Sequence, residues 1–155
     1  MANMERIKGK VNPTFWNRKR VFLTGHTGFK GSWLSSWLIK LGANIVGISK
    51  DIPTNPSIFE ELKLKDQIKH YDQDLRDLTK VKSILSNEKP DFIFHLAAQP
   101  QVLASFKNPL DTILTNVIGT SNLLQIVKKY KFVKSVVIVT TDKVYKNNNK
   151  KIRFS

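Results

Sequence analysis

The sequence of 155 residues contains no cysteine, which excludes a disulfide framework and a metal site built on thiolates. No apolar run is long enough to cross a bilayer, and the polar, basic start at residues 1–10 lacks the apolar core of a signal peptide. The absence of cysteine fits a reducing compartment, and together with the other absences it leads us to expect a cytoplasmic protein. No group of His, Asp and Glu residues has the spacing of metal ligands, so we expect no metal.

Acidic residues are also scarce: 12 Asp and Glu stand against 26 Lys and Arg, for a net charge of +14. Such a balance is typical of proteins that bind nucleic acid or an anionic membrane surface. Here the lysines are scattered over expected helix faces and turns, and they become dense only from residue 128 onward. Aromatic side chains do not alternate with them as a base-stacking platform would require. The distribution favours a solvated lysine-rich surface, and we expect neither a nucleic-acid nor a membrane partner.

The most informative segment is the glycine-rich stretch Gly25-His26-Thr27-Gly28-Phe29-Lys30-Gly31, which follows a short apolar run and precedes an amphipathic one. The expected order is therefore strand, turn and helix. In a dinucleotide-binding turn of this spacing, the first glycine permits the tight turn and the second lets the backbone approach a pyrophosphate. The third lets the helix pack closely on the strand. The pattern predicts a dinucleotide site, and the alternative is a glycine-rich turn that binds nothing.

Five apolar runs of β-type composition alternate with helical stretches, which predicts an α/β fold with a Rossmann-type, doubly wound parallel sheet. The expected strands are Arg20–Thr24, Asn44–Ser49, Ile68–Tyr71, Phe92–Leu96 and Ser135–Thr140. The runs at 92–94 and 136–139 are apolar throughout, as in strands buried on both faces. We expect an extension without structure over residues 1–12 and one dinucleotide-binding domain over residues 13–155.

Two of the expected helices have a recognisable apolar face. In the first, which ends near Gly42 as a C-cap, we expect Trp33 and Trp37 to pack in the core. The last long helix begins near Pro109–Asp111. Its expected inward side chains are Ile113, Leu114, Val117, Ile118, Leu124 and Val127.

Several motifs, taken together and in order, resemble the extended short-chain dehydrogenase/reductase family, and within it the nucleotide-sugar 4,6-dehydratases. Besides the glycine-rich stretch, they are Phe15-Trp16, Pro56-Ser57-Ile58-Phe59-Glu60, Ala97-Ala98-Gln99-Pro100, Thr115-Asn116-Val117-Ile118-Gly119-Thr120 and Thr140-Thr141-Asp142-Lys143. The resemblance covers residues 12–155. It implies a tightly held NAD that is recycled within one turnover, and CDP-glucose as the nucleotide-sugar substrate. The nearest alternatives are a sugar epimerase and a GDP- or dTDP-sugar dehydratase of the same family.

In this family the C4 hydroxyl of the sugar is oxidised, water is lost across C5 and C6, and the hydride returns to C6. The resemblance implies that Asp142 protonates the leaving C6 hydroxyl, that Lys143 is the base at C5, and that Thr141 hydrogen-bonds the C4 oxygen. As alternatives, Asp142 caps a turn and Lys143 is a surface lysine. Their position after a strand of an open α/β sheet, where ligands bind, favours the catalytic roles.

The resemblance also implies which residues hold the cofactor. They are Gly25, Gly28 and Gly31 at the pyrophosphate, Asp74 and Leu75 at the adenine, and Ala97, Ala98 and Gln99 on the nicotinamide side, with Thr27, Phe29, Ser49 and Asn116 in the same binding set. Asp74 has an alternative role as a helix N-cap, and His26 and His95 are interpreted as structural. Ser49 stands where the generic pattern has an acid for the ribose 2′-hydroxyl, and the adjacent Lys50 could favour a 2′-phosphate. The choice of NAD over NADP therefore rests on the resemblance.

The family's Tyr-x-x-x-Lys pair comes after the fifth strand, whereas Tyr145 is followed by Asn149 at the lysine position. The chain ends at Ser155, before the segment that would carry the pair. We therefore expect an N-terminal fragment, truncated after about the fifth strand, that is inactive alone or is a non-catalytic NAD-binding module. Its fifth strand would be an exposed apolar edge and its last helix would carry an apolar patch, so we expect it to associate. The resemblance also implies a possible homodimer, whose interface in the family is formed by the last long helix and by a second helix that this chain lacks.

Overall fold

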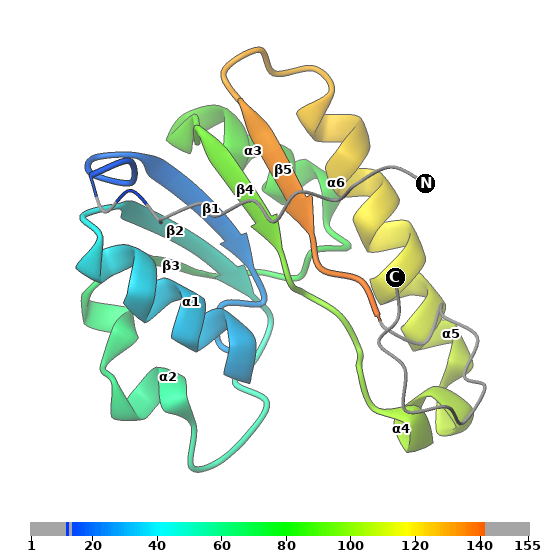
Figure 1. Cartoon of the computed structure of the whole chain (residues 1–155). Helices are drawn as coiled ribbons and strands as arrows, with labels where there is room; N and C mark the ends of the chain where they lie inside the picture. Colours follow the sequence, from blue (N-terminus) through cyan, green and yellow to red (C-terminus); the bar gives the residue numbers. More distant parts are fainter. Residues whose placement is uncertain (1–11, 13, 142–155) are drawn as a thin grey trace, which may run out of the picture.

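A computed structural model describes residues 12 and 14–141 of the chain, which form a five-stranded parallel sheet between helices (Figure 1). The strands are β1 (Arg20–Thr24), β2 (Asn44–Ser49), β3 (Lys69–Asp72), β4 (Phe92–His95) and β5 (Ser135–Ile138). They lie in the order β3-β2-β1-β4-β5, so the chain moves outward from β1 and then returns to its other side. This is a doubly wound Rossmann-type sheet with a switch point between β1 and β4, and the predicted fold class is confirmed.

Helices cover both faces of the sheet (Figure 1). In chain order, the helical elements are α1 (Phe29–Lys40), α2 (Ile58–Glu61), the 3₁₀ turn η1 (Leu64–Asp66), α3 (Leu78–Glu88), α4 (Val102–Lys107), α5 (Pro109–Ile113), the π-helical segment η2 (Leu114–Gly119) and α6 (Thr120–Val127). Side chains alternate along β1 between two cores: Val21 packs with Leu38 of α1, whereas Phe22 packs with Leu123 of α6. Strand β1 is thus the central strand and is buried on both faces, so its carboxyl end lies in the middle of the carboxyl edge of the sheet.

The strand boundaries follow the prediction closely, with small differences at four ends. Strands β1 and β2 have the predicted bounds, and β3 begins and ends one residue later than predicted. Strands β4 and β5 are shorter than predicted. Leu96 and Val139 still donate a hydrogen bond to the neighbouring strand, at 3.1 and 3.0 Å, but regular pairing ends before them.

Burial of β5 on both faces was predicted and is wrong. Val136 packs against the core, whereas Val137 is 45% exposed and Val139 is exposed as well. Strand β5 pairs with β4 alone among the described residues, so it is the edge of the sheet there, and the predicted exposed apolar edge is confirmed.

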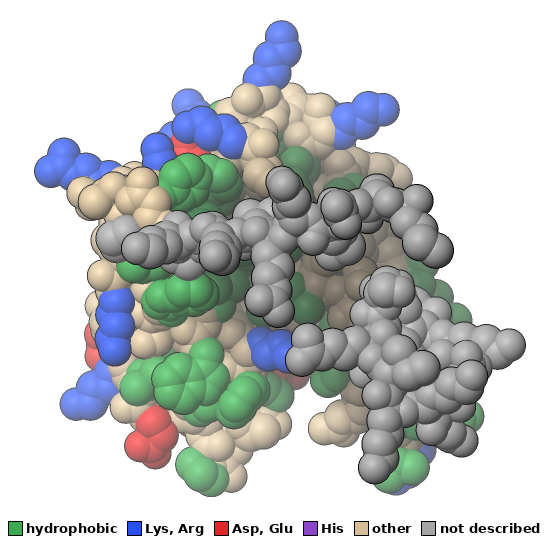
Figure 2. All heavy atoms as spheres, viewed as in Figure 1, with side chains coloured by type: hydrophobic (Ala, Val, Ile, Leu, Met, Phe, Trp, Pro, Cys, Tyr) green, Lys and Arg blue, Asp and Glu red, His purple; other side chains and the backbone are tan. Residues whose placement is uncertain are grey.

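Core positions for Trp33 and Trp37 were also predicted and are wrong, because each side chain is 53% exposed. The buried positions of α1 are Gly31, Ser32, Ser35 and Leu38, three of which are small. Small residues let the helix lie directly on the glycine-rich loop, and this turns the tryptophans toward solvent. Figure 2 shows hydrophobic side chains gathered over α1 on that outer face. The predicted helix end is confirmed: Gly42 follows the C-cap residue with a φ of +82°.

The inward face predicted for the last long helix is largely wrong. Ile113, Val117, Ile118 and Leu124 are exposed, Leu114 and Val127 are partly buried, and the positions buried against the sheet are Gly119, Leu123 and Ile126. The π-helical segment η2 lies between α5 and α6, and its wider turn shifts the register of the side chains that follow it. An extrapolation at 3.6 residues per turn therefore assigns the wrong face. The predicted apolar patch on this helix is confirmed.

The expected extension over residues 1–12 lies outside the described residues except for Asn12, whose Oδ1 accepts a hydrogen bond from the Thr14 N–H at 3.0 Å. Among the described residues, no helix has the length and apolar character that a membrane span requires.

Candidate cofactor-binding and catalytic site

The candidate site lies at the carboxyl edge of the sheet, where the loop after β1 leads into α1 beside the switch point (Figure 1). Gly25 begins this loop with a φ of +70° and donates its N–H to the Ile48 carbonyl of β2 at 2.9 Å. A Cβ on Gly25 would lie 2.8 Å from the backbone nitrogen of Ala97, which follows β4. The loop can cross between β2 and β4 only if residue 25 has no side chain.

The other two glycines of the motif differ in what surrounds them. A Cβ on Gly31 would lie 2.6 Å from the Cα of His26, so the contact between helix and loop requires glycine there. A Cβ on Gly28 would meet only the Gly25 carbonyl oxygen, at the ordinary contact distance of 3.4 Å. The fold itself therefore does not require glycine at 28, and the space beside it is open.

Gly28 is also the N-cap residue of α1, and no side chain caps this end of the helix. The first turn of α1 contains no acidic residue and includes Lys30. The N–H groups of a first helical turn have no partners within the helix and carry part of the positive end of the helix dipole. Open space over Gly28 at such an end fits a pyrophosphate, because the backbone N–H groups are the natural donors to phosphate oxygens.

Thr27 and Ser49 join the loop to the end of β2. The buried Thr27 hydroxyl donates to the Asp51 carbonyl at 2.7 Å and lies 2.7 Å from the Ser49 hydroxyl. Both predicted binding residues thus shape the rim of the site through bonds within the chain, while Lys50 is exposed between Ser49 and Asp51. Phe29, at the start of α1, is 71% exposed.

On the side predicted for the adenine, Asp74 is held by Arg76. Its Oδ1 accepts the Arg76 backbone N–H at 2.8 Å, and its Oδ2 accepts from Nη2 at 2.6 Å. Arg76 also reaches Asp111 of α5 at 2.7 Å, and its guanidinium lowers the pKa of Asp74. The N-cap of α3 is Asp77, so the alternative N-cap role for Asp74 is wrong. Leu75 is buried in the core.

On the side predicted for the nicotinamide, the side-chain amide of Asn116 of η2 binds the backbone of Gln99 through both its oxygen and its nitrogen. The Gln99 N–H donates to Asn116 Oδ1 at 2.7 Å, and Asn116 Nδ2 donates to the Gln99 carbonyl at 3.0 Å. Ala97 is partly buried and Ala98 is exposed, so the segment after β4 presents its middle residue outward. The structure therefore brings Gln99 and Asn116, two residues of the predicted binding set, together.

The histidines are buried within hydrogen-bonded clusters. The Nε2 of His26 lies 2.7 Å from Nδ1 of His70 on β3, and the His26 ring fills the space that a Cβ on Gly47 would occupy. Burial lowers the pKa of His26 to about 4. His95 lies between two threonines, Thr24 and Thr120, that sequence reasoning missed. Nothing in the local sequence distinguishes these threonines from others, because they lie 71 and 25 residues from His95.

Of the predicted catalytic residues, the structure describes only Thr141, which follows β5 at the same edge of the sheet. Thr141 is exposed and is the last described residue, whereas Asp142 and Lys143 lie outside the described residues. Val139 donates its N–H to the His95 carbonyl at 3.0 Å, which brings the chain after β5 alongside the chain after β4.

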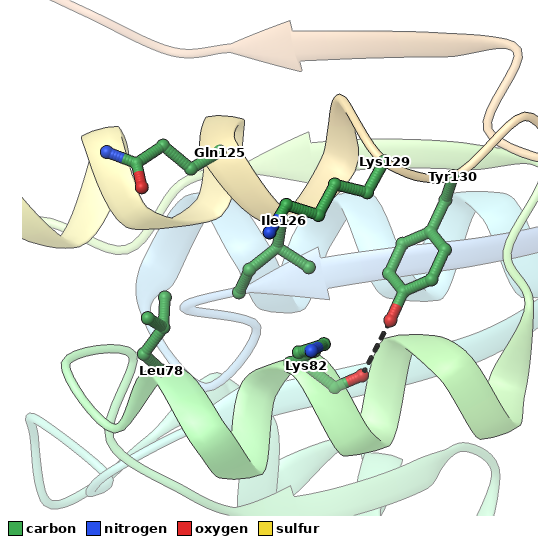
Figure 3. A pocket seen from close by; sticks show the side chains of 6 residues that line it. All are labelled: Leu78, Lys82, Gln125, Ile126, Lys129 and Tyr130. Atoms are coloured by element: carbon green, nitrogen blue, oxygen red, sulfur yellow. Dashed lines mark hydrogen bonds between the residues drawn. The ribbon is translucent and has the colours of Figure 1, made fainter.

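A cavity of about 320 Å³ lies elsewhere, between α3 and α6 (Figure 3). Leu78 and Ile126 supply its apolar walls, and Tyr130 donates to the Lys82 carbonyl at 3.4 Å beside it. These helices cover the sheet face opposite α1, and the cavity contains none of the predicted site residues. In the part of the chain that the structure describes, no cluster of His, Asp and Glu could hold a metal ion.

Comparison with known proteins gives consistent results. A family model described as GDP-mannose 4,6 dehydratase matches residues 22–153. The CDP-glucose 4,6-dehydratase of Salmonella typhimurium is 47% identical over 137 residues, which cover 88% of this chain and 38% of that protein. The chain therefore spans about two fifths of the length of this relative.

Solved structures are similar in fold. A UDP-glucose-4-epimerase from Stenotrophomonas maltophila, with bound NAD and formylated UDP-arabinopyranose, matches with a TM-score of 0.75 at 24% identity, covering 86% of this chain and 40% of that one. The UDP-glucose 4-epimerase of Thermus thermophilus, in complex with NAD, matches with a TM-score of 0.64 at 26% identity, covering 72% of this chain and 34% of that one.

Proposed function

Since this chain belongs to the GDP-mannose 4,6-dehydratase family, within the extended short-chain dehydrogenases/reductases, we propose that it forms the dinucleotide-binding part of a nucleotide-sugar 4,6-dehydratase. The observation that carries the proposal is the open space over Gly28 at the uncapped N-terminus of α1. Packing requires glycine at 25 and 31 but not at 28. At 28, the lack of a side chain leaves room for the pyrophosphate of the ligand.

The cofactor of the proposal is NAD. When bound, it supplies the acceptor and donor of the hydride that C4 of the sugar gives up and C6 receives. Gly25, Gly28 and the first turn of α1 bind the pyrophosphate, and Asp74 lies on the adenine side. Ala97–Gln99, held by Asn116, forms the nicotinamide side. The NAD-bound Thermus epimerase supports NAD, whereas Lys50 beside Ser49 is the feature that would favour NADP.

The substrate of the proposal is CDP-glucose, supported by the 47% identity to the Salmonella dehydratase. Thr141 hydrogen-bonds the C4 oxygen, whose hydroxyl proton passes to the tyrosine of the family's Tyr-x-x-x-Lys pair in the remainder of the enzyme. Lys143 removes the proton at C5, and Asp142 gives a proton to the leaving C6 hydroxyl. An acid and a base on adjacent residues after β5 can act on the adjacent carbons C5 and C6. The absence of cysteine supports a cytoplasmic location.

Calorimetric titration of the purified chain with NAD⁺ and with NADP⁺ tests the binding half of the proposal. We expect saturable NAD⁺ binding. Gly28→Ala should weaken it by about ten-fold or more, since a methyl group would occupy the pyrophosphate space, without changing the unfolding midpoint. Lys40→Ala, at the other end of α1, is the matched control and should leave the affinity unchanged. A folded chain that binds neither dinucleotide would refute the proposal.

A chimera tests the catalytic half. In it, this chain replaces the matching segment of the Salmonella dehydratase, and formation of 4-keto sugar from CDP-glucose is followed over time. We expect turnover, and Asp142→Asn or Lys143→Ala should reduce it roughly 100-fold or more, the usual effect of removing a general acid or base. A chimera that binds NAD⁺ but does not turn over would instead favour a non-catalytic binding module.

A further inference from the structure

We propose that His95 is a positioning residue that holds the segment Ala97–Gln99 from both of its ends through one ring of hydrogen bonds. The inference rests on the proposed function only in assigning this segment to the nicotinamide side of the site. The ring itself consists of described side chains and backbone groups from β1, β4, η2 and α6.

The first half of the ring runs through Thr24, the last residue of β1. Thr24 is fully buried and is paired in register with His95 of β4. Its hydroxyl oxygen accepts the Ala97 N–H at 3.0 Å and lies 2.7 Å from Nδ1 of His95. The start of the segment is therefore tied to one nitrogen of the imidazole.

The second half runs through Thr120 and Asn116. The Nε2 of His95 lies 2.8 Å from the Thr120 hydroxyl, which donates to the Asn116 carbonyl at 2.8 Å. The Asn116 amide in turn holds the N–H and carbonyl of Gln99. The end of the segment is therefore tied to the other nitrogen of the same imidazole, and the exposed Ala98 lies between the two ties.

The bonds of the ring determine which nitrogen of His95 carries the proton. Thr120 uses its only hydrogen on the Asn116 carbonyl, so it must accept from Nε2–H of His95. Thr24 accepts the Ala97 N–H and is free to donate its own hydrogen to Nδ1, which must then be unprotonated. Every donor has one acceptor in the neutral Nε2–H form. A second proton on Nδ1 would leave the Thr24 hydrogen without its acceptor.

A histidine that only fills the core would need no threonine hydroxyl at either ring nitrogen, whereas His95 has one at each. Here both hydrogen-bond paths end on backbone groups two residues apart in the segment that follows β4. Loss of a hydrogen bond in one path should therefore weaken the hydrogen bonds of the other path, because both paths share the rigid imidazole ring.

The test uses Thr120→Val, which removes the hydroxyl at nearly constant volume, and Thr120→Ser, which keeps it. The first readout is amide hydrogen exchange of Ala97, whose direct acceptor Thr24 is unchanged in both variants. We expect faster exchange of Ala97 in Thr120→Val, by roughly five-fold, and wild-type exchange in Thr120→Ser. In wild type, the ¹⁵N signals of the His95 ring should report Nε2–H and an unprotonated Nδ1. Unchanged Ala97 exchange in Thr120→Val, or a proton on Nδ1, would overturn the proposal.

The second readout compares NAD⁺ with ADP, which lacks the nicotinamide end. Thr120→Val should weaken NAD⁺ binding roughly five-fold and leave the affinity for ADP within about two-fold of wild type. Thr120→Ser should bind NAD⁺ with wild-type affinity. Equal weakening of both ligands would overturn the positioning role and indicate general loss of structure. If folded wild type binds neither ligand, the proposed function fails, while the exchange of Ala97 still decides whether the ring is coupled.

Discussion

Gly31 lies against the backbone of His26 so closely that a Cβ on it would stand 2.6 Å from the His26 Cα. This contact is where α1 rests on the glycine-rich loop, and it determines how near the helix comes to the sheet. Ser32 supports the same contact, since its hydroxyl donates to the His26 carbonyl at 3.1 Å. The third glycine of the motif thus serves the packing of the chain, whereas Gly28 faces open space.

Gly31→Ala is expected to lower the free energy of unfolding by about 3 kcal/mol, because the methyl group meets backbone that cannot move aside without displacing α1. Gly28→Ala should change it by no more than about 0.5 kcal/mol. Urea denaturation of both variants provides the measurement. Equal stability of the two proteins would contradict the different roles assigned to the two glycines.

Stability should fall as the pH decreases from 7 to 5. Burial lowers the pKa of His26 from 6.5 to about 4, so the unfolded chain takes up this proton at a higher pH than the folded one. The contribution of His26 is complete above about pH 6.5 and is lost progressively toward pH 4. Between pH 7 and pH 5 it amounts to about 2 kcal/mol. The pKa values of His70 and His95 are lowered by burial too and act in the same direction.

Urea unfolding at pH 7 and pH 5 measures this dependence, and His26→Asn should reduce the difference between the two pH values. The carboxyl groups of Asp74, Glu88 and Asp91, whose pKa values are lowered, titrate below this window and contribute little to it. A difference as large in His26→Asn as in wild type would assign the pH dependence to other groups.

The tryptophans of α1 should contribute little to stability. Because Trp33 and Trp37 are half exposed, replacing either with Gln is expected to change the free energy of unfolding by at most about 0.5 kcal/mol. Leu38→Ala, on the buried side of the same helix, should cost about 3 kcal/mol. Thermal and urea unfolding of the three variants provide the comparison. If Trp37→Gln lowered the free energy of unfolding as much as Leu38→Ala does, the prediction would be contradicted, and the tryptophan would contribute to the core.

The apolar face of α4 and α5 should make the chain self-associate. Leu103 and Phe106 are 76% and 80% exposed, and Leu110 continues the same exposed stretch. Sedimentation velocity is expected to show a mass that rises with protein concentration, and Phe106→Glu should shift the equilibrium toward monomer. Lys40→Ala, at the polar end of α1, is the control and should leave the association unchanged. A monomer at every concentration would contradict the prediction.

The central strands and the glycine-rich loop could be predicted from local patterns. The apolar runs of β1 and β2 end at residues that cannot continue a buried strand, so their bounds appear directly in the sequence. The spacing of Gly25, Gly28 and Gly31 likewise predicts strand, turn and helix in order, because glycine is confined to turns and close approaches of this kind. The resemblance to the family rests on the same short, contiguous motifs.

The tertiary structure alone decided which face of each helix is buried and which distant groups meet. Ser35 is buried and Trp37 is not because α1 must lie close to the loop, and the π-helical register of η2 turns Val117 outward. Single hydrogen bonds in the ring around His95 join residues that are up to 73 positions apart. These hydrogen bonds form only when the parallel strands are paired and the last helix is packed on the sheet, so no local sequence pattern could predict them. Periodicity and spacing are properties of neighbours in the chain, whereas burial and hydrogen-bond partners are properties of neighbours in space.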